Sequence, residues 1–168
     1  MKNKRGYTLI ELIIAVGLFA LIMMLASGAY LVMIGINRQV QSVATGIDNL
    51  AFALETMTRT IRTGTNYSCN NSGDCNNGGT TFSVRNASGV TTSYALSGGV
   101  ITQDGVALTD SSVTVSSLVF YASGTGKPPG DYAQSRVTII VSGTVPSGPG
   151  ETEPFNVETG ATMRGSDL

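Results

Sequence analysis

The longest apolar stretch of the chain lies near its N-terminus. From Leu12 to Ile36 there is no charged residue, and the stretch consists of apolar residues, glycines, Ser27 and Tyr30. About 25 residues at 1.5 Å each give roughly 37 Å of helix, which exceeds the bilayer core of about 30 Å. The pattern therefore predicts that residues 7–36 form a helix long enough to span a membrane.

The next stretch, residues 37–64, has a one-sided apolar pattern. Its apolar residues recur at spacings of three and four, as along one face of a helix: Val40, Val43, Ile47, Leu50, Leu54, Met57 and Ile61. Gly64 follows the last charged residue of this stretch and marks the predicted helix end. We expect one continuous helix of about 55 residues, apolar all round in its first half and amphipathic in its second.

In residues 65–168 the pattern of apolar residues changes. From about Thr80 onward it has the period of two that is typical of β-strands. We expect strands at Thr81–Arg85, Thr91–Leu96, Gly99–Gln103, Val113–Tyr121, Ser135–Ser142 and Phe155–Met163. Turn residues separate them, among them the segment Pro146–Gly150, and such short connections favour an antiparallel sheet. The apolar face of this sheet needs a cover, and the amphipathic half of the helix is available for that. The predicted fold class is α+β, with a long N-terminal helix packed on a C-terminal antiparallel β-sheet domain.

Two cysteines occur in the β-rich part. Cys69 and Cys75 are separated by five polar or small residues, and we expect a disulfide in an oxidising compartment; two free thiols are the alternative. A zinc site would need four ligands, but the chain has no His and no further Cys. The loop 70–79 contains Asp74 but lacks the spaced carboxylates of a calcium loop, so no metal is predicted.

Composition argues against an enzyme. The chain has a net charge of −1 and no His, and its acidic residues are scattered near predicted turns instead of forming a catalytic constellation: Asp104, Asp110, Asp131, Glu151, Glu153 and Glu158. We therefore expect no catalytic residues and no cofactor. There is no basic excess, so nucleic acid is not favoured as a partner, although it stays open as an alternative.

The first residues combine a basic leader with one isolated carboxylate. Lys2, Lys4 and Arg5 precede the apolar run, which predicts a cytoplasmic N-terminus and a C-terminal part on the outer side. Glu11 lies at the beginning of the apolar run, where a buried charge needs a partner such as an amine. The alternative is a carboxylate at headgroup depth that is stabilised by the helix dipole.

The segment from Gly6 to Leu12, Gly-Tyr-Thr-Leu-Ile-Glu-Leu, resembles the processing and methylation signature of type IV prepilins and type II secretion pseudopilins. The resemblance implies cleavage after Gly6, methylation of Tyr7 as the new N-terminus, and a filament in which Glu11 faces the N-terminus of an adjacent subunit. The family most often has Phe at the first mature position, where this chain has Tyr7. Many family members have Pro-Ala-Tyr further along, where this chain has Gly28-Ala29-Tyr30 and so lacks the proline kink.

The resemblance also implies partners and a location. A prepilin peptidase/methyltransferase, other pilin or pseudopilin subunits, an inner-membrane assembly platform and, before assembly, membrane lipid are the expected partners. The precursor would be a single-pass protein of the inner membrane, and the product a periplasmic or extracellular filament. The expected division is a removed leader at 1–6, a membrane and filament-core helix at 7–36, its amphipathic continuation at 37–64 and a β-rich domain at 65–168.

The subunit type and an alternative function remain open. The chain lacks the C-terminal cysteine pair of many major pilins, so a minor pilin or minor pseudopilin is favoured. The alternative function is an adhesive, ligand-binding or DNA-binding module that uses the pilin anchor to reach the surface, with the loop at 123–132 as its binding element.

Overall fold

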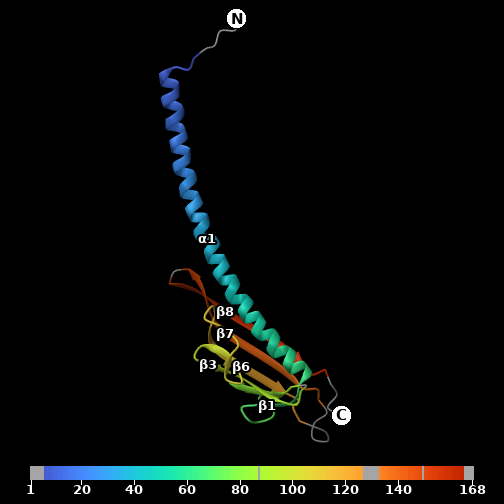
Figure 1. Ribbon diagram of the computed structural model, residues 1–168. Coiled ribbons are helices and arrows are strands. Elements are labelled where there is room, and N and C mark those ends of the chain that lie inside the picture. Colours follow the sequence, from blue (N-terminus) through green and yellow to red (C-terminus); the bar gives the residue numbers. More distant parts are fainter. Residues whose placement is uncertain (1–5, 87, 127–132, 149, 165–168) are drawn as a thin grey trace. The chain divides into compact units, whose positions relative to one another are not determined.

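The computed structural model describes residues 6–86, 88–126, 133–148 and 150–164 (Figure 1). The chain forms two compact units, Met1–Val40 and Gln41–Leu168. A single helix, α1 (Leu9–Thr63), extends from the first unit into the second and is 55 residues long. Its length agrees with the prediction, and it continues without interruption through Gly28. A proline at this position, as in the Pro-Ala-Tyr sequence of the similar family, would remove a backbone hydrogen bond.

The second unit contains eight strands within its described residues, and each is antiparallel to its neighbours. They are β1 (Thr65–Cys69), β2 (Thr81–Arg85), β3 (Thr91–Ser97), β4 (Val100–Gln103), β5 (Val106–Ala107), β6 (Thr114–Ser123), β7 (Arg136–Gly148) and β8 (Glu151–Thr162). Strands β1 to β5 form one sheet in sequence order, and β6, β7 and β8 form a second. The α+β prediction is confirmed, while the turn pattern does not reveal the division into two sheets.

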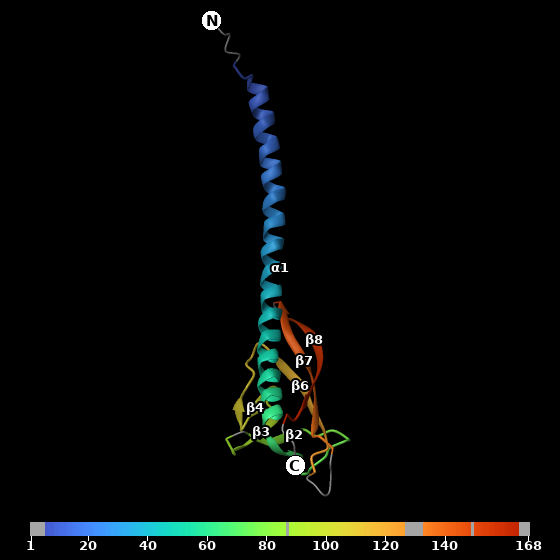
Figure 2. The same ribbon diagram turned by 90° about the vertical axis from the view of Figure 1, so that its right-hand side faces the viewer.

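The C-terminal part of α1 packs on both sheets and closes one hydrophobic core with them (Figure 2). Its buried residues are Gly46, Leu50, Ala53, Leu54, Met57, Thr58 and Ile61. The predicted stripe is therefore correct from Leu50 onward but wrong at Val40 and Ile47, which are 60% and 51% exposed. The reason is that the close approach to the strands occurs at Gly46, one residue away from Ile47 on the helix.

Two strands were not predicted, and several strand boundaries differ from the prediction, most of all the end of β7 at Gly148 and the start of β8 at Glu151. Strands β1 and β5 were not predicted, because β1 directly follows the helix without an alternating apolar pattern and β5 has only two residues. Pro146 was expected in a turn but lies within β7, opposite Thr152 of β8. Pairing with β6 ends at Thr144, so β7 has a single partner strand at the proline, which is where a missing N–H group is tolerated.

Candidate functional site

Helix α1 begins with a side-chain cap. The backbone N–H of Glu11 donates to the Thr8 hydroxyl (3.3 Å), and the N–H of Leu12 donates to the Thr8 carbonyl (3.3 Å). Thr8 is therefore the N-cap residue, and Glu11 occupies the third helical position. The spacing Thr-x-x-Glu is a sequence signal for a helix start, although the cap was not predicted from it.

The Glu11 carboxylate is exposed and makes no ion pair within the described part of the chain. It lies in the first turn of α1, where the helix dipole favours a negative charge. This position stabilises the helix start and leaves the carboxylate oxygens available to a partner outside the chain.

The bond after Gly6 lies in an accessible segment. Gly6 and Tyr7 precede the helix, Tyr7 is 87% exposed, and a Cβ atom at Gly6 would have no atom within 4 Å. The leader charges Lys2, Lys4 and Arg5 lie outside the described residues. A peptidase can therefore approach the Gly6–Tyr7 bond without unfolding any element of the structure.

The first part of α1 exposes its apolar side chains on all faces. The most apolar 18-residue window of the helix has a mean hydropathy of 2.7, and none of that window is buried within the structure. By length and composition this helix can cross a membrane. The apolar surface is much larger than an isolated soluble protein usually exposes, and surfaces of this size mark membrane or protein interaction sites.

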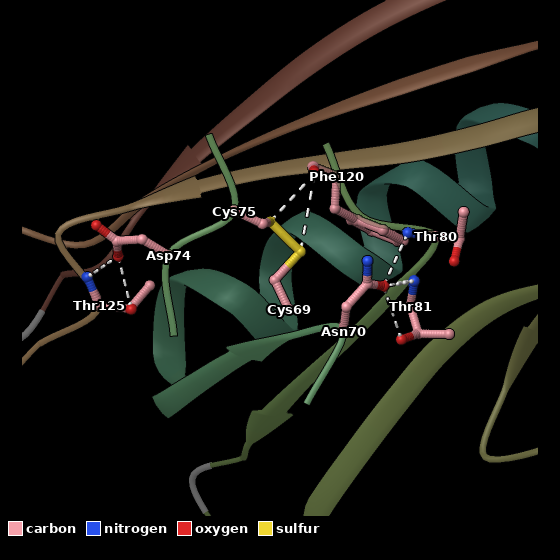
Figure 3. The surroundings of a disulfide bond; sticks show 8 residues. All are labelled: Cys69, Asn70, Asp74, Cys75, Thr80, Thr81, Phe120 and Thr125. Carbon is pink, nitrogen blue, oxygen red and sulfur yellow. Dashed lines mark hydrogen bonds between the residues drawn. A yellow bond between two sulfur atoms is a disulfide. The ribbon is translucent and has the colours of Figure 1, made fainter. Parts of the chain in front are cut away.

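The structure contains the expected disulfide between Cys69 and Cys75 (Figure 3). Cys69 is the last residue of β1 and is completely buried, while Cys75 belongs to the following loop. Asn70 holds the other end of this loop, since its side-chain oxygen accepts hydrogen bonds from the N–H groups of Thr80 (3.0 Å) and Thr81 (3.1 Å). The loop from Cys69 to Gly79 is thus fixed by a covalent bond and by side-chain hydrogen bonds.

This disulfide loop, residues 69–79, covers one edge of the second sheet. The Cys75 N–H donates to the Ala122 carbonyl (2.9 Å), and Gly79 and Phe120 exchange two backbone hydrogen bonds of 2.8 Å each. Strand β6 is at the edge of its sheet, so these bonds satisfy backbone groups that would otherwise face solvent or another chain. The loop therefore acts as a structural cover.

Asp74 connects the same loop to the end of β6. Its carboxylate accepts hydrogen bonds from the Thr125 hydroxyl (2.7 Å), the Thr125 N–H (2.9 Å) and the Gly124 N–H (3.3 Å). The Thr125 bonds hold the pKa of Asp74 below its ordinary value of 3.8. Among the described residues, there is no group of three or more Asp, Glu, His or Cys side chains placed so that they could hold a metal ion.

The other acidic residues do not converge on one site. Asp104 accepts hydrogen bonds from the backbone N–H and the hydroxyl of Ser93. Asp110 accepts hydrogen bonds from the hydroxyl and the backbone N–H of Ser112, and these bonds lower the pKa of Asp110. Asp131 lies outside the described residues. The remaining three, Glu151, Glu153 and Glu158, are exposed on β8. The described carboxylates thus support turns or face solvent, and no catalytic arrangement is formed among them.

Comparison with known protein families gives a match on the capped N-terminal segment. Residues 1–27 match the family described as the prokaryotic N-terminal methylation motif. Neither curated proteins nor solved structures gave a match. The motif supports membership of the type IV pilin and pseudopilin family. It points to a structural subunit whose membrane-anchored precursor is processed and then assembled with other pilins.

Proposed function

We propose that this protein is a structural subunit of a type IV pilus-like or type II secretion pseudopilus filament. The observation that carries the proposal is the methylation motif at residues 1–27, which coincides with an apolar helix that the chain leaves uncovered. In this proposal a prepilin peptidase cleaves after Gly6 and the amine of Tyr7 is methylated.

Each segment of the chain has a separate task in this proposal. The leader, residues 1–6, holds the N-terminus in the cytoplasm by its positive charge and is removed. Residues 7–36 cross the inner membrane in contact with lipid and later pack in the filament core. Residues 37–64 fasten the β-rich domain, residues 65–168, to this helix. An inner-membrane assembly platform transfers the subunit from lipid to filament.

Glu11 has an assembly role in this proposal. Cleavage after Gly6 creates an α-amino group four residues before Glu11, and the carboxylate of one subunit binds the amine of the next. Its exposure and its lack of an ion pair within the described residues leave it available for such a contact. Pairing would offset the cost of burying both charges when the helices pack together.

The processing step is tested by replacing Gly6 with leucine in cells that contain a prepilin peptidase. We expect Gly6→Leu to keep the mass of the precursor, because a bulky side chain next to the bond obstructs the peptidase, whereas Gly17→Leu, within the helix, is processed normally. Intact-protein mass spectrometry of membrane fractions measures both. A mature, methylated Gly6→Leu protein would contradict the proposed cleavage position.

A further inference from the structure

The second sheet carries a small groove on its face near the end of β6. The groove has a volume of about 250 Å³ and is lined by Asn76, Tyr121, Ala122, Ser123, Arg136 and Thr138. Tyr121 pairs with Thr138 and Ser123 pairs with Arg136 across β6 and β7, so these four side chains lie on the same face of the sheet. Asn76 reaches the groove from the disulfide loop, which the bond between Cys75 and Ala122 holds in place.

Among the described residues that line the groove, Arg136 is the only one with a charged side chain. Arg136 is exposed and makes no ion pair within the described ranges, and the carboxylate of the disulfide loop, Asp74, accepts hydrogen bonds from Gly124 and Thr125. A guanidinium can bind a carboxylate through two parallel hydrogen bonds. The hydroxyl and amide groups around it can bind further oxygen atoms of the same ligand. The groove therefore has the chemistry to bind a carboxylate.

Two exposed carboxylates lie on the same sheet, at the end opposite to the groove. Glu151 and Glu153 begin β8, directly after the hairpin that joins it to β7. Both are exposed, and neither makes an ion pair with another described residue. Strand β7 has 13 residues between Arg136 and Gly148, which corresponds to roughly 40 Å. Arg136 therefore cannot reach these carboxylates in its own chain.

We infer that the Arg136 groove binds the Glu151/Glu153 end of β8 from a second copy of this chain. The charges are complementary and lie at opposite ends of one sheet, so the contact is head-to-tail. A head-to-tail contact whose rotation does not close builds an open helical assembly, as a filament requires. The inference rests on the proposed filament function and adds a contact between β-rich domains to the packing of the apolar helices.

The contact is tested by photo-crosslinking of the full chain assembled in cells. A benzophenone amino acid replaces Tyr121 in the groove, and the same amino acid replaces Val106, an exposed residue of the other sheet, as the control. We expect a crosslink from position 121 to the peptide that contains Glu151 and Glu153 of a second copy, identified by mass spectrometry. A crosslink to a different protein, or to another segment of a second copy, would overturn the inference.

Charge reversal provides the second measurement. Arg136→Glu should reduce the crosslink from position 121 at least fivefold, and adding Glu151→Lys and Glu153→Lys should restore it. All three positions are exposed, so the substitutions remove no buried contact, and circular dichroism of each variant checks that it is folded. Crosslinking that is unchanged in Arg136→Glu would contradict the contact. If filaments form without the crosslink, the inference fails and the proposed function stands; if the chain is never processed or assembled, the proposed function itself fails.

Discussion

At the residue scale, two buried tyrosines differ in how their hydroxyl groups are satisfied. The Tyr67 hydroxyl lies at the end of α1, where it is within hydrogen-bonding distance of the carbonyls of Ile61 (2.7 Å) and Gly64 (3.0 Å). The Tyr94 hydroxyl is fully buried and has no hydrogen-bond partner in the structure as described. Burial raises the pKa of Tyr94.

Removing the two hydroxyl groups should therefore have different effects on the free energy of unfolding. Tyr67→Phe should lower the free energy of unfolding by about 1–2 kcal/mol, because it removes a buried hydroxyl donor from the carbonyl groups at the helix end. Tyr94→Phe should leave it unchanged or raise it, since a buried hydroxyl without a partner is lost. Urea denaturation followed by circular dichroism compares the two variants. Equal destabilisation by both would contradict the different roles of the two hydroxyls.

Asp74 predicts a specific pH dependence of stability. Its pKa is lower in the folded than in the unfolded chain, so the stabilisation is complete above the unfolded value, near 4, and is lost as the pH falls through the folded value. Asp74→Asn should therefore lower the free energy of unfolding at pH 7. The difference in this free energy between the variant and the wild type should become smaller as the pH falls toward 3. Urea midpoints between pH 7 and pH 3 measure this difference. A difference that does not change with pH would contradict the role of the charge.

At the scale of elements, regular patterns were predictable and close approaches were not. The helix was predicted to the correct length because its apolar run and its amphipathic stripe continue without a break. The burial of Gly46 was missed because it depends on Ser112 and Val145, which are far away in the sequence. The cover of β6 by the disulfide loop was missed for the same reason: cysteine spacing predicts a bond, but not which strand edge the closed loop meets.

Gly46 should tolerate no side chain. A Cβ atom there would lie 2.6 Å from the Ser112 carbonyl oxygen and 2.7 Å from Val145 Cγ1, so α1 or the strands would have to move. Gly46→Ala should lower the free energy of unfolding by about 1–3 kcal/mol, the usual cost of overpacking. Gly35→Ala is the matched control, because nothing lies within 4 Å of it and alanine favours the helix. Urea denaturation of both variants gives the comparison, and a Gly46→Ala protein as stable as the control would show that the contact can relax.

At the scale of the whole molecule, the two units bury their apolar residues in different ways. The second unit covers its apolar residues internally, with the C-terminal part of α1 and both sheets in one core. The first unit covers none of its most apolar window, and its only charge between Leu9 and Ile36 is Glu11. A segment with this composition is stable only when lipid or other helices surround it. In the proposed assembly this apolar surface moves from lipid to a bundle of helices, and Glu11 is the one charged side chain between Leu9 and Ile36 that both environments would have to accommodate.

Glu11 should consequently be required for assembly but not for the steps before it. We expect Glu11→Ala to be cleaved after Gly6 and to remain in the membrane, because the alanine leaves the Thr8 hydroxyl cap and the apolar helix in place. The fraction that enters sheared filaments should fall at least tenfold, because the amine of an adjacent subunit would be buried without a counter-charge. Glu55→Ala removes another exposed carboxylate of α1 and should assemble normally. Quantitative immunoblots of membrane and filament fractions measure both variants; normal incorporation of Glu11→Ala would mean that the carboxylate acts only on the helix start.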